Sequence, residues 1–146
     1  MFKILNKITI ETWTYLYIIL FFLLVGMNFF PFLFREDGMM IGGFNLAEEA
    51  NLLHLLSGMW AATALWLSRS SMLYYFRIFG TVYFLDGVVG LLAGKAFLNL
   101  NLFHSHVAPH GDFMVRLLLN IPHLTIGGLA MIIGFILCKK KVDSDH

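Results

Sequence analysis

Charged residues are so sparse along the chain that the stretches between them outline its elements. No Asp, Glu, Lys or Arg occurs from Thr12 to Phe34, from Ala50 to Ser68 or from Leu117 to Cys138. A fourth apolar stretch, between Arg77 and Lys95, carries only Asp86. About 20 apolar residues cross the hydrocarbon core as a helix, and these runs are continuous rather than alternating, which disfavours strands. The pattern predicts an all-α, four-helix membrane bundle with spans at about 13–34, 50–68, 78–94 and 117–138.

The basic residues indicate how this bundle is oriented. Four helices place both chain ends on one side, together with the connection between the second and third helices. Seven of the ten Lys and Arg residues fall on that side: Lys3, Lys7, Arg69, Arg77, Lys139, Lys140 and Lys141. Because short loops rich in Lys and Arg stay in the cytoplasm, we predict cytoplasmic termini. The two longer connections, at about 35–49 and 95–116, then lie on the outer side.

The composition excludes an ordinary soluble monomer and a nucleic-acid-binding protein. Of the 146 residues, 59% are hydrophobic and 13% are charged, which is about half the charged fraction of a typical soluble domain. So few charges cannot cover a small globule, and the apolar surface must face lipid or another subunit. The formal net charge of +1 provides no basic field for nucleic acid. The predicted partners are therefore the lipid bilayer and other integral membrane subunits.

A short motif occurs twice, at the outer ends of the second and fourth predicted helices. It reads N-x2-H-x3-G, with its copies 69 residues apart: Asn51, His54 and Gly58, then Asn120, His123 and Gly127. Positions i, i+3 and i+7 share one face of a helix, and a lipid-facing histidine is costly. Each stripe is therefore predicted to face the interior as part of a polar core. Pro122 fits either the first turn of a helix that begins near Asn120 or a kink in one that begins near Asp112.

The motif and the residues between its copies resemble a known family. The segments NLLHLLSG and YYFRIFGTVYFLDGVVGLL, followed by the second N-x2-H-x3-G, are similar to a bacterial family of small four-helix integral membrane proteins of unknown function. The similarity covers about residues 51–137. It implies a multi-pass protein of the bacterial inner membrane with an Asn/His pair on the second and fourth helices, and it implies no activity. Asp86 and the histidine-rich loop are not matched to the family's pattern.

His54 and His123 are candidate cofactor ligands. Two histidines that face each other across a four-helix bundle can hold haem b, with one imidazole on each face of the iron. Equal depth on parallel helices is compatible with this arrangement. The alternative is a structural role, in which the imidazoles bond to neighbouring carbonyls or Asn side chains.

A second group of candidate ligands lies in the connection before the last helix. It has the sequence H-x-H-x3-H-x-D and comprises His104, His106, His110 and Asp112. Three imidazoles and a carboxylate provide the ligands of a zinc or copper site, although the spacing matches no fixed metal signature. The alternative is a solvated loop in which Asp112 caps the next helix.

Asp86 is the other exception to an apolar bundle. At the rise of an α-helix it lies about 13 Å from both Arg77 and Lys95, near the middle of the membrane. An intramembrane carboxylate is costly and marks a functional candidate. We expect no direct contact with His54, which lies closer to the outer surface. The expected partners of Asp86 are Thr63, Trp60 or Tyr83, or a bound proton.

Two further sets of residues concern packing. The glycines that follow Asp86, namely Gly87, Gly90 and Gly94, are expected to let helices approach closely within the bundle. The aromatic residues of the first helix, from Trp13 to Phe34, are expected to contact lipid or another subunit.

The function favoured by the sequence is that of a non-catalytic accessory or structural subunit of a larger membrane complex. No signature such as G-x-S-x-G, a Walker loop or H-E-x-x-H is present, and so small a bundle leaves little room for an enclosed active site, so an enzyme is the less favoured class. Two alternatives stay open. One is a haem- or metal-binding redox protein that uses His54 and His123 or the His104-His106-His110 loop, and the other is a small proton-linked transporter built around Asp86.

Overall fold

The computed structural model describes residues 8–30, 48–98 and 111–137, and these ranges contain four α-helices and no strand. The helices are α2 (Ile10–Gly26), α3 (Glu48–Leu67), α4 (Arg69–Ala93) and α5 (Phe113–Ile132). A 3-10 turn, η1 (Met27–Phe29), follows α2, and a π-helical segment, η4 (Ile133–Leu137), continues α5. The predictions of an all-helical chain and of four helices are confirmed.

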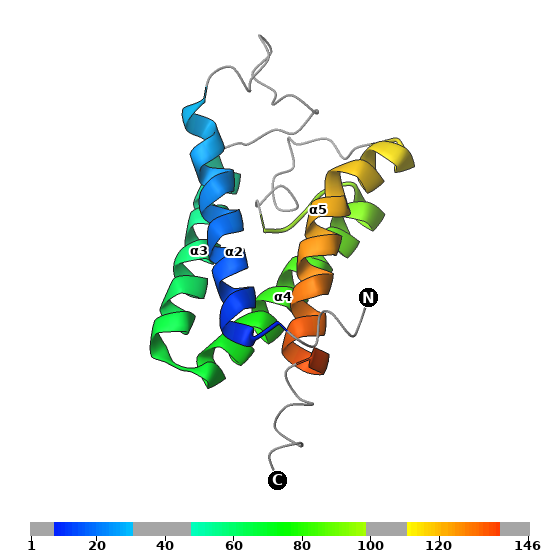
Figure 1. Cartoon of the computed structure of the whole chain (residues 1–146). Coiled ribbons are helices and arrows are strands. Elements are labelled where there is room, and N and C mark those ends of the chain that lie inside the picture. Colours follow the sequence, from blue (N-terminus) through cyan, green and yellow to red (C-terminus); the bar gives the residue numbers. More distant parts are fainter. Residues whose placement is uncertain (1–7, 31–47, 99–110, 138–146) are drawn as a thin grey trace.

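The helices pack as two antiparallel pairs. α2 lies along α3, and α4 lies along α5 in the most extensive contact of the molecule. The pairs meet at the end where α3 turns into α4 and diverge toward the opposite end (Figure 1). We call these the closed end and the open end. α2 and α4 run toward the open end, and α3 and α5 run back, so α3 and α5 are parallel, as the order of four successive spans predicted.

Two of the described helices are long and apolar enough to cross a membrane. They are Arg69–Ala93 and Phe113–Ile136, whereas Ile10–Gly26 is apolar but shorter, at 17 residues. α4 begins nine residues before the predicted span at 78. The reason is Ser68, which alone separates α3 from α4 and caps α4 by accepting a hydrogen bond from Ser71 N at 3.1 Å. The segment expected to connect the two helices therefore forms the first turns of α4.

α5 begins at Phe113 rather than near Asn120. Asp112 is its N-cap, and the carboxylate accepts a hydrogen bond from Met114 N at 2.8 Å. Pro122 lies inside the helix. Of the two interpretations of Pro122, the longer helix that starts near Asp112 is therefore correct. His123 consequently lies in the middle of α5, deeper in the bundle than a first-turn residue.

An aromatic core joins the two helix pairs. Tyr17 and Phe21 of α2 and Tyr75, Phe76, Phe79 and Tyr83 of α4 are all buried. The Tyr17 ring packs edge-on against Phe76, at 5.1 Å between centroids, and its hydroxyl donates to the Ile126 carbonyl of α5 at 2.7 Å. The inner aromatic face of α2 thus packs within the fold, and only its outer face is left for lipid or a partner.

Glycines allow the backbones of α4 and α5 to touch. A Cβ at Gly80 would lie 2.6 Å from the backbone nitrogen of Met131, and one at Gly127 would overlap the backbone of Phe84. Gly87 and Gly90 of α4 face Leu124 and Asn120 of α5 in the same way. Close packing of this kind is typical of membrane helices, where small residues let backbones approach.

Candidate functional site

Asp86 is fully buried in α4, and one of its oxygens holds the chain that follows the helix. α4 ends at Gly94, whose left-handed conformation (φ 72°) turns the backbone. The chain then returns toward Asp86, and Oδ1 accepts hydrogen bonds from Phe97 N at 2.7 Å and Leu98 N at 2.8 Å. Non-helical backbone in an apolar interior needs acceptors for its amides. Oδ1 of Asp86 is the acceptor for two successive amides.

The other oxygen of Asp86 faces α5. Oδ2 lies 2.7 Å from Nδ1 of His123. The distance is that of an ion pair, but the two groups are not aligned as a hydrogen bond. His123 is 23% exposed whereas Asp86 is not exposed at all. One carboxylate therefore links α4, the returning segment at 95–98 and α5.

Among the described residues, none of the three expected side-chain partners forms a hydrogen bond with Asp86, and the alternative of a bound proton stays a prediction. The Thr63 hydroxyl donates to the Met59 carbonyl within α3, at 2.8 Å, and the Trp60 ring contacts Tyr75. The Tyr83 hydroxyl is buried without a hydrogen-bond partner. His123 contacts Asp86 instead, because it lies ten residues into α5 and so reaches the level of Asp86 on the antiparallel α4.

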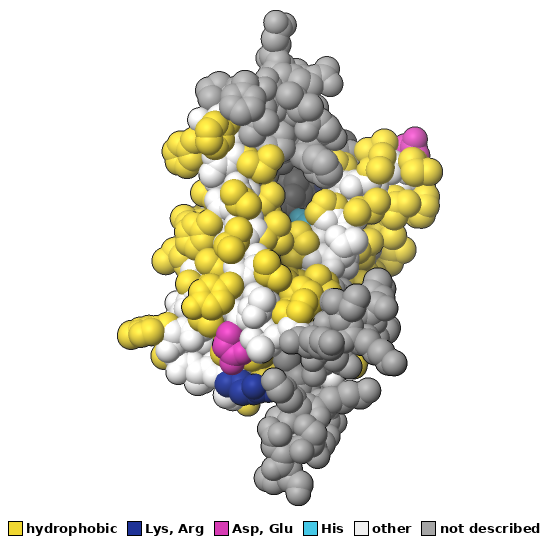
Figure 2. Space-filling model, viewed as in Figure 1, with side chains coloured by type: hydrophobic (Ala, Val, Ile, Leu, Met, Phe, Trp, Pro, Cys, Tyr) yellow, Lys and Arg dark blue, Asp and Glu magenta, His cyan; other side chains and the backbone are white. Residues whose placement is uncertain are grey.

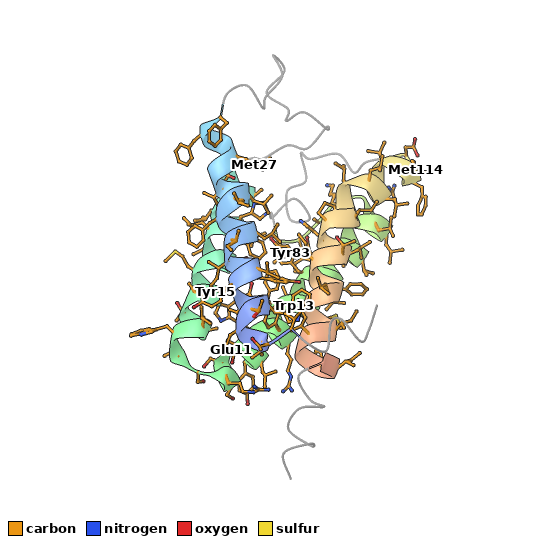
Figure 3. The ribbon with its side chains drawn as sticks, in the orientation of Figure 1. Glu11, Trp13, Tyr15, Met27, Tyr83 and Met114 are labelled. Atoms are coloured by element: carbon orange, nitrogen blue, oxygen red, sulfur yellow. The ribbon has the colours of Figure 1, made fainter. Side chains whose placement is uncertain are left out.

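His54 and His123 belong to one layer of four rings across the bundle. The His54 ring stacks on Phe21 with centroids 5.9 Å apart, Phe21 contacts Tyr83 at 6.0 Å, and Tyr83 contacts His123 at 5.1 Å. His54 and His123 are also close enough for their charges to interact. Figure 3 shows Tyr83 in the space between the two helix pairs. We call these four residues the histidine layer.

Two polar groups of the histidine layer lack a well-aligned hydrogen bond. His54 Nδ1 and the Tyr83 hydroxyl are buried and form no hydrogen bond, although Ser57 lies near that hydroxyl. Buried polar groups are normally paired, so the unpaired Nδ1 of His54 is an exception within this layer.

Asn120 and the two motif glycines pack against neighbouring helices. Asn120 is buried against Gly90 of α4, and its Nδ2 donates to the Arg116 carbonyl at 2.8 Å. Gly127 lies against the backbone of Phe84, while Gly58 lies against the Phe21 Cβ and the Phe22 ring of α2. Asn51 is partly buried in α3. The space beside both motif glycines is therefore filled by neighbouring helices.

The histidine-rich connection falls largely outside the described part of the chain. His104, His106 and His110 are not described, and Asp112 is the N-cap of α5. Within residues 8–30, 48–98 and 111–137, no group of three or more His, Cys, Asp or Glu side chains is arranged to hold a metal ion. The proposed zinc or copper site in this connection stays a prediction.

Comparison with known proteins adds no further assignment. No family model, no curated protein and no solved structure matches the chain. The resemblance to a bacterial membrane family therefore stays a prediction, and the function must be argued from the residues themselves.

Proposed function

We propose that this chain is a non-catalytic accessory subunit of a larger complex in the bacterial inner membrane, embedded there as a four-span bundle with cytoplasmic termini. The observation that carries the proposal is the outward orientation of large apolar side chains on all four helices. Leu23, Trp66, Leu92 and Leu118 are each more than half exposed, with Trp66 at 85%. Figure 2 shows hydrophobic side chains over much of the visible surface. Apolar surface of this extent marks contact with lipid or with another protein.

The position of α2 and α3 supports four spans rather than two. Both helices pack at the same level as α4, and α2 also bonds to α5 through Tyr17. Their outer faces are apolar too, as Ile19 and Leu56 show. Trp66 and Tyr74, both exposed, lie near the closed end, where aromatic residues typically mark the membrane surface. A bilayer that surrounds α4 and α5 would therefore surround α2 and α3 as well.

The interior supports a non-catalytic role. Asp86 is the one buried carboxylate among the described residues, and both of its oxygens already contact backbone amides or an imidazole.

The outer face of α2 is a surface suited to a neighbouring transmembrane helix: Tyr15, Leu16, Ile19, Phe22 and Leu23 are all exposed.

Photo-crosslinking from adjacent positions of α2 tests the proposal. A photoreactive residue at Phe22, which is exposed, is expected to crosslink to one integral membrane protein in stoichiometric yield within native membranes. The same group at Phe21, which is fully buried, is expected to crosslink only within the chain. If Phe22 captures lipid alone and gentle detergent extraction yields a lone monomer, the subunit proposal is wrong.

A proton-linked transporter is the second candidate, and the Asp86–His123 pair favours it. A buried carboxylate beside an imidazole, with the unpartnered His54 Nδ1 and Tyr83 hydroxyl nearby, has the composition of a proton relay. Proteoliposomes that contain the wild type would then carry a proton flux that Asp86→Asn abolishes. Equal flux in the two proteins would remove this candidate.

A further inference from the structure

Two arginines bond across the α4–α5 pair, one toward each end. Arg77 of α4 donates from Nε to the Gly134 carbonyl of η4 at 2.9 Å, and Arg116 of α5 donates from a terminal nitrogen to the Leu92 carbonyl of α4 at 3.0 Å. The part of α4 from Arg77 to its C-cap Gly94 is about 26 Å long at the rise of an α-helix. The hydrocarbon core of a bilayer is about 30 Å thick. In the proposed membrane embedding, Arg77 therefore lies beside the headgroups of the leaflet at the closed end.

The side chain of Arg77 is held in place by η4, which lies along the closed-end part of α4 (Figure 1). Its guanidinium carbon is 5.5 Å from the centre of the Phe135 ring. A Cβ at Gly134 would lie 2.9 Å from the Arg77 backbone nitrogen, so only a glycine allows this close approach. η4 ends at Leu137, and the last four carbonyls of a helix have no partner within it. Nε satisfies one of these carbonyls, and this bond fixes the guanidinium.

The two terminal nitrogens of Arg77 stay available for a ligand. In the described part of the chain, no atom accepts a hydrogen bond from them, and Arg77 forms no ion pair there. Arg116 differs, because its terminal nitrogens face the carbonyls of Leu92 and Gly111, at 3.0 and 3.5 Å. A guanidinium is always charged, and its fork of donors matches two oxygens of a phosphate. Arg77 is therefore the arginine of this pair that is suited to bind an oxyanion.

The surface beside Arg77 is apolar and suits the rest of a phospholipid. Tyr74, Ile78 and Phe135 are all exposed. Tyr74 lies one turn before Arg77 on the same face of α4, and tyrosines at this level typically lie among headgroups. Ile78 follows Arg77 on the side of the membrane interior. A free anion would leave Ile78 and Phe135 uncovered, whereas the acyl chains of a phospholipid cover them.

Charge favours an anionic phospholipid over a zwitterionic one. Both kinds of headgroup contain a phosphate, but a zwitterionic headgroup also carries an ammonium group close to it. That ammonium group is repelled by the guanidinium of Arg77, since like charges at short range are unfavourable. A headgroup without a cation retains the full attraction.

We propose that the terminal nitrogens of Arg77 bind the phosphate of one anionic phospholipid in the leaflet at the closed end. Tyr74 lies beside the headgroup, and Ile78 and Phe135 lie against the acyl chains. Gly134 is a positioning residue, because its carbonyl holds Nε of Arg77. The site rests on the membrane embedding proposed above and does not require a partner subunit.

Lipid titration of the purified full-length protein in an uncharged detergent tests the proposal, with native mass spectrometry to count bound lipids. Phosphatidylglycerol is the probe, and we expect one tightly bound molecule per chain and weaker binding of phosphatidylcholine. Arg77→Gln is expected to weaken phosphatidylglycerol binding about tenfold, because a charge-assisted bidentate contact is lost. Arg77→Lys is expected to weaken it about threefold, because one ammonium group cannot hold the Gly134 carbonyl and two phosphate oxygens together.

Arg69→Gln is the matched control. Arg69 is exposed at the start of α4, about 12 Å further from the membrane interior along the helix. Its loss removes the same charge and should change binding by less than about twofold, as for other exposed charges. The proposal is wrong if Arg77→Gln binds phosphatidylglycerol as tightly as the wild type does, or if Arg69→Gln loses as much affinity as Arg77→Gln. If Arg77→Gln unfolds, as judged by circular dichroism, Arg77→Lys decides, and unchanged binding in it would overturn the proposal.

Two further measurements separate the lipid from other occupants. Inorganic phosphate at the concentration of the lipid is expected not to displace phosphatidylglycerol, and displacement would indicate a site for free anions instead. A photoreactive residue at Tyr74 is expected to capture lipid in native membranes, and capture of a protein there would overturn the proposal. A lone monomer that still selects phosphatidylglycerol through Arg77 contradicts only the accessory-subunit proposal. A chain that crosslinks to a membrane protein from Phe22 but binds lipid independently of Arg77 contradicts only the lipid site.

Discussion

The α4–α5 pair and the α2–α3 pair are held together by different means. α4 and α5 touch through their backbones at Gly80 and Gly127, whereas α3 approaches α2 at Gly58 through the side chains of Phe21 and Phe22. The first pair also contains the Asp86–His123 contact, while the second adds His54 by stacking it on Phe21. The comparison indicates that α4–α5 is the rigid element that positions the site and that α2–α3 docks against it through side chains.

Removal of the Asp86 side chain is expected to have the largest effect. Asp86→Ala leaves the amides of Phe97 and Leu98 without an acceptor and His123 without its carboxylate. Leaving the two buried amides without an acceptor costs about 2–6 kcal/mol. We expect a loss of that size in the free energy of unfolding, measured in detergent by denaturant titration.

Asp86→Asn is the matched variant, because its amide oxygen can still accept hydrogen bonds from the two amides. Its loss should be clearly smaller than that of Asp86→Ala. Equal losses would mean that the returning segment contributes little and that the contact with His123 dominates.

A methyl group on Gly127, where α5 touches α4, is expected to have a smaller effect than the loss of the Asp86 side chain. A Cβ at Gly127 would overlap the Phe84 backbone, which cannot move aside without shifting α4. Gly127→Ala should therefore lower the free energy of unfolding by about 1–3 kcal/mol, the usual range for overpacking. Thermal unfolding followed by circular dichroism measures the loss.

Gly128 is the control for this prediction. A Cβ there would meet only the Phe84 ring, at 3.6 Å, which is ordinary contact. Gly128→Ala is expected to be close to neutral. If Gly127→Ala and Gly128→Ala change the free energy of unfolding by the same amount, helix propensity and not the contact between α4 and α5 determines the change.

The hydrogen bond between α2 and α5 is expected to contribute less to the free energy of unfolding. Tyr17→Phe removes the hydroxyl that donates to the Ile126 carbonyl at 2.7 Å and leaves the ring in place. Hydrogen bonds between membrane helices average about 0.6 kcal/mol, and a loss near that value is expected in the same unfolding assay. Tyr15→Phe, on the exposed face of α2, should be neutral, and a loss as large as that of Tyr17→Phe would contradict the assignment.

The helices could be predicted from the sequence because hydropathy is a local property. The capping role of Asp112 also follows from a short segment, and the packing role of Gly87 and Gly90 was anticipated from their spacing. The start of the third helix was expected near residue 78 because Arg77 was taken to lie outside it, whereas α4 begins at Arg69. Arg77 instead lies within α4, where its Nε donates to the Gly134 carbonyl of the π-helical segment at 2.9 Å.

The partners of Asp86 could not be predicted, because they depend on contacts between distant parts of the chain and not on local hydropathy. Two of them are backbone amides, which carry no residue-type signal, and they reach Asp86 only because Gly94 turns the chain back. Gly94 followed by Lys95 at the end of an apolar helix is a C-cap signal. It was the one indication in the sequence that the chain turns after α4. The third partner, His123, required the correct start of α5, since a helix that began near Asn120 would have left it near the surface.

The smallest effect on stability is expected on the outside of the α2–α3 pair. Trp66 is 85% exposed, so Trp66→Ala should change the free energy of unfolding by no more than about 0.5 kcal/mol in detergent, as for other surface positions. Trp13, which is 7% exposed, provides the contrast, and Trp13→Ala should cost about 3–5 kcal/mol because it leaves a cavity. A loss for Trp66→Ala that approaches the Trp13 value would mean that this side chain is buried against a second protein in the purified sample. The contact would then survive extraction, and α3 rather than α2 would carry the strongest partner surface.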